Sequence, residues 1–196
     1  MTTSKDDYLM PNGNFLSEGI KPKVLAQLHE FYISGEITSP DTYVEVFDTI
    51  RHARDNDTVK IYINSFGGDL FSAIQFMRVM SDSEAYVVCS VEGACMSAAT
   101  MIFLAADAVE ITPHSSFMVH NYSSGAFGKG GELYHQIQHE RRWSENLLKE
   151  VYKDFLTDSE IEHVLENKDL WMDVDEVVLR MEERERLRKE TNSKTK

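Results

Sequence analysis

The chain has 196 residues, of which 42% are hydrophobic and 27% are charged, and this suits one globular domain with a substantial core. Its 20 basic and 33 acidic residues give a net charge of −13, which argues against a nucleic-acid-binding surface because such a surface needs a basic patch. No segment reaches the ~18 apolar residues of a membrane span, and the polar N-terminus lacks the basic start and apolar core of a signal peptide. We therefore expect a cytoplasmic protein that binds neither nucleic acid nor a membrane.

The first quarter of the chain predicts an arm, a short helix, a strand and a second helix. Residues 1–21 are polar and include glycine and proline, which favours an N-terminal arm. Apolar residues three and four apart predict a short helix over 24–31, and a strand over 31–37 follows. A serine followed by proline then marks the start of a helix over 39–54, because serine is a favoured cap and proline suits the first helical position.

The middle of the chain alternates between strands and helices. A β-prone strand over 59–64 leads through a glycine turn at 65–69 into an amphipathic helix over 70–80. The stretch 87–106 is predicted to be a buried strand, a tight turn of small residues and an apolar helix. Two short strands follow, over 108–111 and 116–120.

The last third is predicted to be mostly helical. A glycine-rich loop over 123–131 precedes one long helix over 132–155, which at 1.5 Å per residue would be ~36 Å long. That length exceeds what a compact domain of this size needs, so the helix is expected to project and pack on a neighbour. A helix with a capping box starts at 157, an apolar run over 170–172 follows, and Asp173 caps a last helix. The charged tail over 182–196 has no apolar face and is expected to fray.

This alternation of strands and helices predicts an α/β fold with a mostly parallel sheet and crossover helices on its faces. In such sheets ligands gather near the carboxyl ends of the strands. The pair Gly67 and Gly68 follows one predicted strand, Ser97 follows the next, and His120 ends a third. Taken alone, Ser97 has two interpretations: it caps the helix that it begins, or it is a nucleophile beside the backbone donors of that helix.

These groups could form a complete hydrolytic site. A serine needs a base to act as a nucleophile, and histidine is the usual base. The base needs a third group to orient it, and Asp169 lies before an apolar segment where it could turn inward. The glycine pair could supply backbone N–H groups close to a substrate.

Metal binding and disulfide formation are not expected. His135 and His139 are four residues apart on the long helix, but no third ligand stands at a supporting spacing, so no metal site is predicted. Cys89 and Cys95 lie in or beside the buried strand and are predicted to be free, buried thiols, which suits a reducing compartment.

Several motifs in the same order resemble the ClpP family, the serine-peptidase subunits of ATP-dependent Clp proteases. The resemblance extends from about residue 31 to about residue 179, and Ala98 departs from it, because the family usually has methionine there. The motifs that carry it are Tyr62–Gly68, Gly93–Ala99, Phe117–Asn121 and Lys168–Asp169.

The resemblance implies a ClpP/crotonase-like fold of repeated β-β-α units, with one peptidase domain over 22–181 and a protruding handle over about 122–156. It also implies roles for five residues: Ser97 as nucleophile, His120 as general base, Asp169 as the orienting acid, and the backbone N–H groups of Gly68 and Ala98 as the oxyanion hole.

By the same resemblance, handles interdigitate between two stacked heptameric rings. The subunit would hydrolyse unfolded polypeptides inside the closed chamber, and a Clp-type AAA+ unfoldase would deliver them. The subunit itself would need no cofactor or metal, because the unfoldase uses the ATP. Two alternatives stay open: a catalytically silent ClpP-like ring subunit, and a crotonase-type acyl-CoA enzyme that stabilises an enolate with backbone donors.

Overall fold

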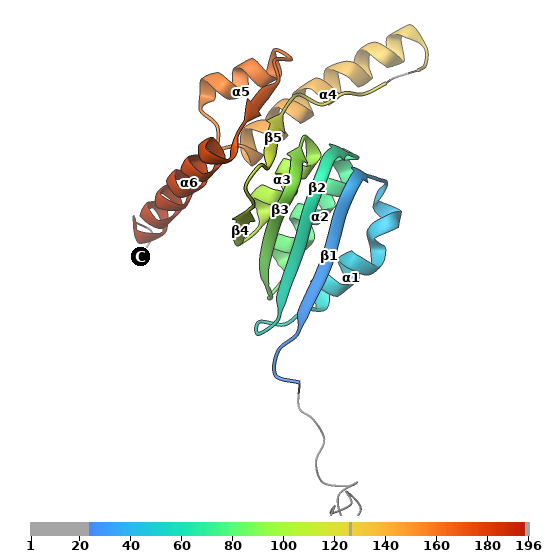
Figure 1. Cartoon of the computed structure of the whole chain (residues 1–196). Helices are drawn as coiled ribbons and strands as arrows, with labels where there is room; N and C mark the ends of the chain where they lie inside the picture. Colours follow the sequence, from blue (N-terminus) through green and yellow to red (C-terminus); the bar gives the residue numbers. More distant parts are fainter. Residues whose placement is uncertain (1–23, 126, 195–196) are drawn as a thin grey trace, which may run out of the picture.

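The computed structural model describes residues 24–125 and 127–194 (Figure 1). The arm predicted over residues 1–21 lies outside this part of the chain. No helix of the described part is long and apolar enough to cross a membrane.

The strands of the described residues form one six-stranded sheet in the order β1-β2-β3-β5-β6, with β4 also paired to β3. All pairs are parallel except that of β5 with β6, which is antiparallel. The predicted parallel sheet is therefore confirmed. The strands are β1 (Leu28–Ile37), β2 (Thr58–Gly68), β3 (Tyr86–Met96), β4 (Ala108–Ile111), β5 (Ser116–Val119) and β6 (Leu170–Met172).

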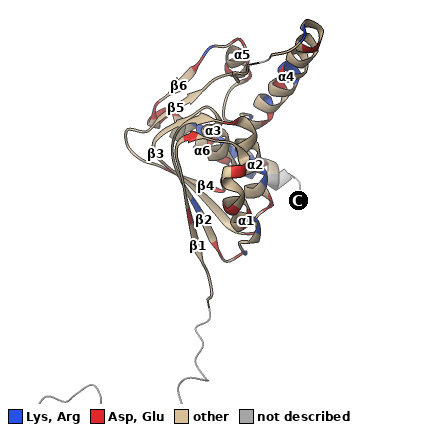
Figure 2. Cartoon of the chain, turned by 90° about the vertical axis from the view of Figure 1, so that its right-hand side faces the viewer, with Lys and Arg blue, Asp and Glu red and all other residues tan. Residues whose placement is uncertain are grey.

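Three crossover helices cover one face of this sheet (Figures 1 and 2). Along β2, every second side chain points into the core beneath them, so that Val59, Ile61 and Ile63 are fully buried. The helices fill the other side of this core with Ile50, Phe76 and other buried apolar residues. They are α1 (Val44–His52), which follows a 3₁₀ turn over Pro40–Tyr43, α2 (Leu70–Asp82) and α3 (Ala98–Ala105).

The rest of the chain adds three helices: α4 (Gly130–Val151), α5 (Asp158–Leu165) and α6 (Val174–Lys194). The first half of α4 extends away from the sheet (Figure 1). Its apolar residues Tyr134 and Ile137 are 62% and 51% exposed, whereas Leu148 and Val151 near its end are buried. The second half of α4 thus anchors it, and the first half presents apolar side chains to solvent.

Three local predictions are wrong. The predicted helix over 24–31 is absent, because residues 24–27 are irregular and β1 begins at Leu28, where the chain pairs with β2. The glycine turn predicted at 65–69 and the tight turn predicted within 87–106 are mostly extended backbone instead. The strands β2 and β3 continue through them, and Ser65 of β2 pairs with Cys95 of β3. The tail predicted to fray is helical up to Lys194 within the described residues.

The C-terminal extension of α6 is held by one buried side chain. Arg184 is 8% exposed and donates a hydrogen bond of 2.9 Å to the carbonyl oxygen of Leu104, in the last turn of α3. A cation suits this position, because the end of a helix carries a partial negative charge. Burial lowers the pKa of Arg184 to about 10, still far enough above neutrality to keep the charge. This long-range contact ties the middle of α6 to α3. Beyond it, ion pairs one turn apart, between Arg186 and Glu190 and between Lys189 and Glu185, support the helical tail.

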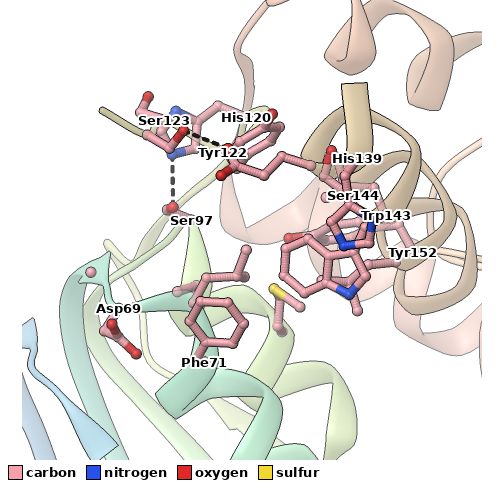
Figure 3. Close-up of a pocket in the computed structure, with 18 residues that line it drawn as sticks. Asp69, Phe71, Ser97, His120, Tyr122, Ser123, His139, Trp143, Ser144 and Tyr152 are labelled. Carbon is pink, nitrogen blue, oxygen red and sulfur yellow. Dashed lines mark hydrogen bonds between the residues drawn. The ribbon is translucent and has the colours of Figure 1, made fainter. Parts of the chain in front are cut away.

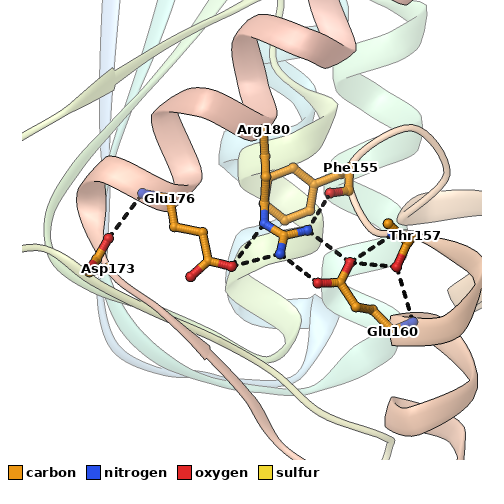
Figure 4. A network of polar contacts seen from close by, with 6 residues as sticks. All are labelled: Phe155, Thr157, Glu160, Asp173, Glu176 and Arg180. Atoms are coloured by element: carbon orange, nitrogen blue, oxygen red, sulfur yellow. Dashed lines mark hydrogen bonds and ion pairs between the residues drawn. The ribbon is translucent and has the colours of Figure 1, made fainter.

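A second arginine joins α6 to α5 (Figure 4). The guanidinium of Arg180 donates to both carboxylate oxygens of Glu160, at 2.9 and 2.6 Å, and to the carboxylate of Glu176 at 2.6 Å. It also donates to the carbonyl oxygen of Phe155 at 3.1 Å. Glu160 closes the predicted capping box with Thr157, which is confirmed. These bonds lower the pKa of Glu160 from 4.5 to about 2.

We expect this lowered pKa to make α5 and α6 sensitive to acid. A carboxylate with a lower pKa in the folded state contributes stability above its unfolded pKa, and this contribution is lost as the pH falls toward the folded pKa. In urea unfolding followed by circular dichroism, Glu160→Gln should cost about 1 kcal/mol at pH 7, a modest value because solvent screens part of the pair. The difference from wild type should shrink between pH 5 and pH 2. Glu162→Gln, an exposed change on the same helix, is the control, and a difference that stays constant with pH would contradict this account.

Candidate active site

Ser97 joins β3 to α3 in an unusual backbone conformation. Its φ and ψ are 54° and −127°, a region that residues other than glycine rarely adopt. Its N–H donates a hydrogen bond of 2.8 Å to the carbonyl oxygen of Met118 on β5, which holds the turn against the neighbouring strand. The side chain of Ser97 makes no capping hydrogen bond to α3. The capping interpretation of this serine is therefore wrong, and its hydroxyl is directed elsewhere.

The hydroxyl of Ser97 points at His120, which follows β5 (Figure 3). Oγ of Ser97 and Nε2 of His120 are 2.7 Å apart, a short hydrogen-bond distance. Both side chains are partly exposed, so a substrate can reach them. A serine hydroxyl within hydrogen-bond reach of an imidazole is the arrangement in which the imidazole can take the hydroxyl proton.

The glycine pair at the end of β2 lies against the serine turn. A Cβ added to Gly67 would come 2.6 Å from Cβ of Ser97 and 3.2 Å from the backbone nitrogen of Ala98. Gly67 has φ of +97°, so both its conformation and its surroundings require glycine. Gly68 and Ala98, the predicted oxyanion donors, line the same cavity as Ser97. Ala98 is the first residue of α3, where backbone N–H groups have no partner within the helix.

Asp169 is placed opposite His120 but is not bonded to it. Val119 pairs with Leu170 in the antiparallel ladder of β5 and β6, so the next two residues, His120 and Asp169, face each other just beyond the ladder. Asp169 is exposed, and within the described residues its carboxylate makes no hydrogen bond to the histidine. The structure thus brings four of the five predicted site residues together around one cavity: Gly68, Ser97, Ala98 and His120. The fifth, Asp169, lies opposite His120 without a hydrogen bond to it.

A cavity of about 530 Å³ adjoins the serine and histidine (Figure 3). Its far wall is apolar and includes Phe71 from α2 and Trp143 from α4, whose rings stack with centroids 5.5 Å apart. Met101, Leu147 and other apolar residues complete this wall. Phe71 and Trp143 were not predicted as site residues. Trp143 and Leu147 are four residues apart on the long helix, a spacing that is typical of an apolar helical face and that does not reveal a cavity.

The other candidate chemistries find little support in the geometry. The two cysteines are buried and free as predicted, and burial raises the pKa of the Cys89 thiol, which opposes formation of the reactive thiolate. Of the two spaced histidines, His139 lines the cavity. The described residues contain no group of three histidine, cysteine, aspartate or glutamate side chains arranged to hold a metal ion.

Comparison with known proteins agrees with this geometry. The sequence matches the family model described as Clp protease over residues 24–179. The chain belongs to the Clp protease family. The fold is similar to that of a point mutant of ClpP1 from Listeria monocytogenes, with a TM-score of 0.64 and 20% sequence identity over 78% of this chain and 86% of the ClpP1 chain. The predicted ClpP-like fold is therefore confirmed, whereas no curated protein sequence matches the chain.

The close approach of Gly67 to the serine gives a test within this Clp protease fold. Gly67→Ala should slow the reaction of Ser97 with a fluorophosphonate probe, because the new methyl group would overlap Cβ of Ser97. Gly35→Ala is the matched control: Gly35 also has a positive φ, of +83°, but a Cβ there would meet nothing within 4 Å. Both changes place alanine at a positive φ, which costs about 1–2 kcal/mol in urea unfolding. Gly67→Ala should cost more than Gly35→Ala, because its Cβ would also lie 2.8 Å from the backbone oxygen of Met96. Equal labelling rates in the two variants would show that the contact does not matter.

Proposed function

We propose that the chain is a serine endopeptidase, the proteolytic subunit of a ring-shaped compartmentalised protease. The observation that carries this proposal is the 2.7 Å contact between Oγ of Ser97 and Nε2 of His120, at the mouth of a cavity in a Clp protease fold. A serine whose side chain caps no helix, in a backbone conformation that costs free energy, is best explained by a chemical role.

In the proposed mechanism His120 takes the proton of the Ser97 hydroxyl as its oxygen attacks the carbonyl carbon of a peptide bond. The N–H groups of Gly68 and Ala98 stabilise the negative charge that develops on the carbonyl oxygen. His120 then gives its proton to the departing amine, which leaves an acyl-enzyme on Ser97. A water molecule, activated by the same histidine, hydrolyses the acyl-enzyme and restores the serine. Asp169 orients the imidazole and stabilises its protonated form.

The cavity supports a preference for apolar residues next to the cleaved bond. Its wall of Phe71, Trp143 and Met101 offers favourable burial to an apolar side chain of an extended peptide. Unfolded polypeptides expose such residues, whereas folded proteins bury them. Unfolded polypeptide chains are thus the proposed substrates, and short peptides are the products.

The proposed assembly follows from α4 and from the family. The exposed apolar residues of the first half of α4 suit a handle that packs between two stacked heptameric rings. A Clp-type AAA+ unfoldase would supply the substrate and use ATP, so the subunit needs no cofactor or metal. We propose a cytoplasmic location, with no nucleic-acid or membrane partner.

One observation favours a second candidate, a catalytically silent ring subunit. Asp169 is exposed and does not contact His120, so the site lacks an orienting acid in this arrangement. A crotonase-type acyl-CoA enzyme is less well supported, because enolate stabilisation by backbone donors gives no reason for the paired serine and histidine.

A labelling experiment separates these candidates. A fluorophosphonate should label the wild-type protein at Ser97, and Ser97→Ala should abolish both labelling and hydrolysis of an unfolded substrate such as casein, while thermal unfolding stays unchanged. Ser34→Ala, an exposed change on β1 away from the cavity, should behave as wild type. A wild-type protein that is neither labelled nor active would favour the silent subunit, and labelling that persists in Ser97→Ala would refute the nucleophile.

The assembly can be tested at the exposed half of α4. Native mass spectrometry should find wild-type particles that are large multiples of the 22.5 kDa chain. Combining Tyr134→Glu with Ile137→Glu should reduce these particles to single rings or smaller species, because burying two carboxylates at an interface is costly. Gln138→Glu adds a charge at an exposed position of the same helix and is the control. A monomeric wild type, or an unchanged mass in the double variant, would contradict the handle.

A further inference from the structure

The loop between α5 and β6, residues 166–169, carries Asp169 and has a defined backbone path. The N–H of Lys168 donates to the carbonyl oxygen of His163 at 3.1 Å, and the N–H of Asn167 donates to that of Val164 at 2.9 Å. Asn167 has φ of +64°. This pair of bonds around a left-handed residue is the Schellman motif, which ends a helix and reverses the chain. The motif fixes how the loop leaves α5, but it does not fix where the loop lies relative to His120.

The side chain of Asn121 supplies that connection. Its Nδ2 donates to Oδ1 of Asn167 at 3.0 Å and to the carbonyl oxygen of Leu165 at 3.3 Å. Its Oδ1 accepts a hydrogen bond of 2.9 Å from the N–H of Tyr122. Both polar ends of the amide are therefore used, and the side chain joins two segments that are 46 residues apart in the sequence.

His120 and Asp169 lie between this connection and the sheet. On one side of them, Val119 pairs with Leu170 in the ladder of β5 and β6. On the other side, Asn121 is bonded to Asn167. Two segments that are hydrogen-bonded on both sides of one residue pair cannot shift in register without breaking one of these sets of bonds. This fixes which residue of the loop faces the histidine.

We propose that Asn121 is a positioning residue that keeps Asp169 within reach of His120. The inference rests on the proposed function, in which Asp169 orients the histidine. Within the described residues the carboxylate of Asp169 has no hydrogen bond of its own, so its location depends on the backbone around it. The Asn121 amide restricts that backbone from the histidine side and keeps the carboxylate on the loop opposite the histidine.

The test is a double-mutant cycle on the rate at which a fluorophosphonate labels Ser97. Asn121→Ala and Asp169→Asn should each slow labelling about tenfold or more, because both impair the same orientation of the histidine. The labelling rate of the double variant should be within about twofold of that of the slower single variant, because loosening the loop has no further effect on the histidine once the carboxylate is absent. Asn167→Gly permits the left-handed backbone and removes the side chain that accepts from Asn121, but it leaves the bond from Asn121 to Leu165, so its effect should be in the same direction and smaller.

Loss of stability alone would not give this pattern. Ser83→Ala removes two hydrogen bonds far from the site, to the carbonyl oxygen of Ile50 and from the N–H of Ala85, and is the matched control. It should lower the melting temperature without slowing labelling. A labelling rate of Asn121→Ala within about twofold of wild type would overturn the proposal. So would a double variant whose reduction in labelling rate is the product of the two single reductions.

The proposed function and the positioning role can fail separately. A wild-type protein that is not labelled refutes the function, and the connection is then tested by trypsin cleavage after Lys168, quantified by mass spectrometry. Asn121→Ala should speed this cleavage about fivefold or more over wild type, because the loop loses its only side-chain connection to the residue after His120 among the described residues. Ser83→Ala should not change the rate of this cleavage. Equal cleavage rates in Asn121→Ala and wild type would overturn the positioning role.

Discussion

The backbone turn at Ser97 is the constraint on which the site depends. A residue other than glycine in this conformation costs about 1–3 kcal/mol, and the surrounding structure must supply that free energy. The N–H of Ser97 is bonded to Met118 on β5, and Gly67 leaves just enough room for the serine Cβ. The apolar helix α3, buried along nearly its whole length, anchors the other end of the turn. The core of the domain thus holds the serine hydroxyl toward His120.

The parallel sheet explains why residues far apart in the sequence meet at this turn. The strands β2, β3 and β5 are neighbours, and the carboxyl ends of parallel strands share one edge of a sheet. Gly68 ends β2, Ser97 follows β3 and His120 follows β5. Asp169 differs, because it comes before β6, the strand that runs antiparallel. It therefore reaches the same edge from a loop rather than from the end of a core strand.

This difference also separates the features that could be predicted from the sequence from those that could not. The strands of the core, the parallel pairing and the buried cysteines follow from local patterns. Local patterns also placed Ser97 and His120 near the ends of strands, where they could meet, but their roles followed from the resemblance to the ClpP family. The helical tail could not be predicted, because Arg184 is held by a carbonyl 80 residues away. The stacked Phe71 and Trp143 join two helices whose relative position no local pattern specifies. Local sequence likewise says nothing of the distance between Asp169 and His120.

The proposed site therefore has a rigid part and an adjustable part. The serine and the histidine follow core strands, and the glycine pair ends one, so all of them are held by the sheet and by the start of α3. Asp169 rests on α5, on its loop and on β6, a unit that Arg180 braces through its bonds to Glu160 and Glu176. Since these supports are polar and partly exposed, solvent competes with them more than with the apolar core. Under the proposed mechanism, nucleophile and base are built in by folding, whereas the orienting acid is positioned by a few hydrogen bonds at the edge of the domain.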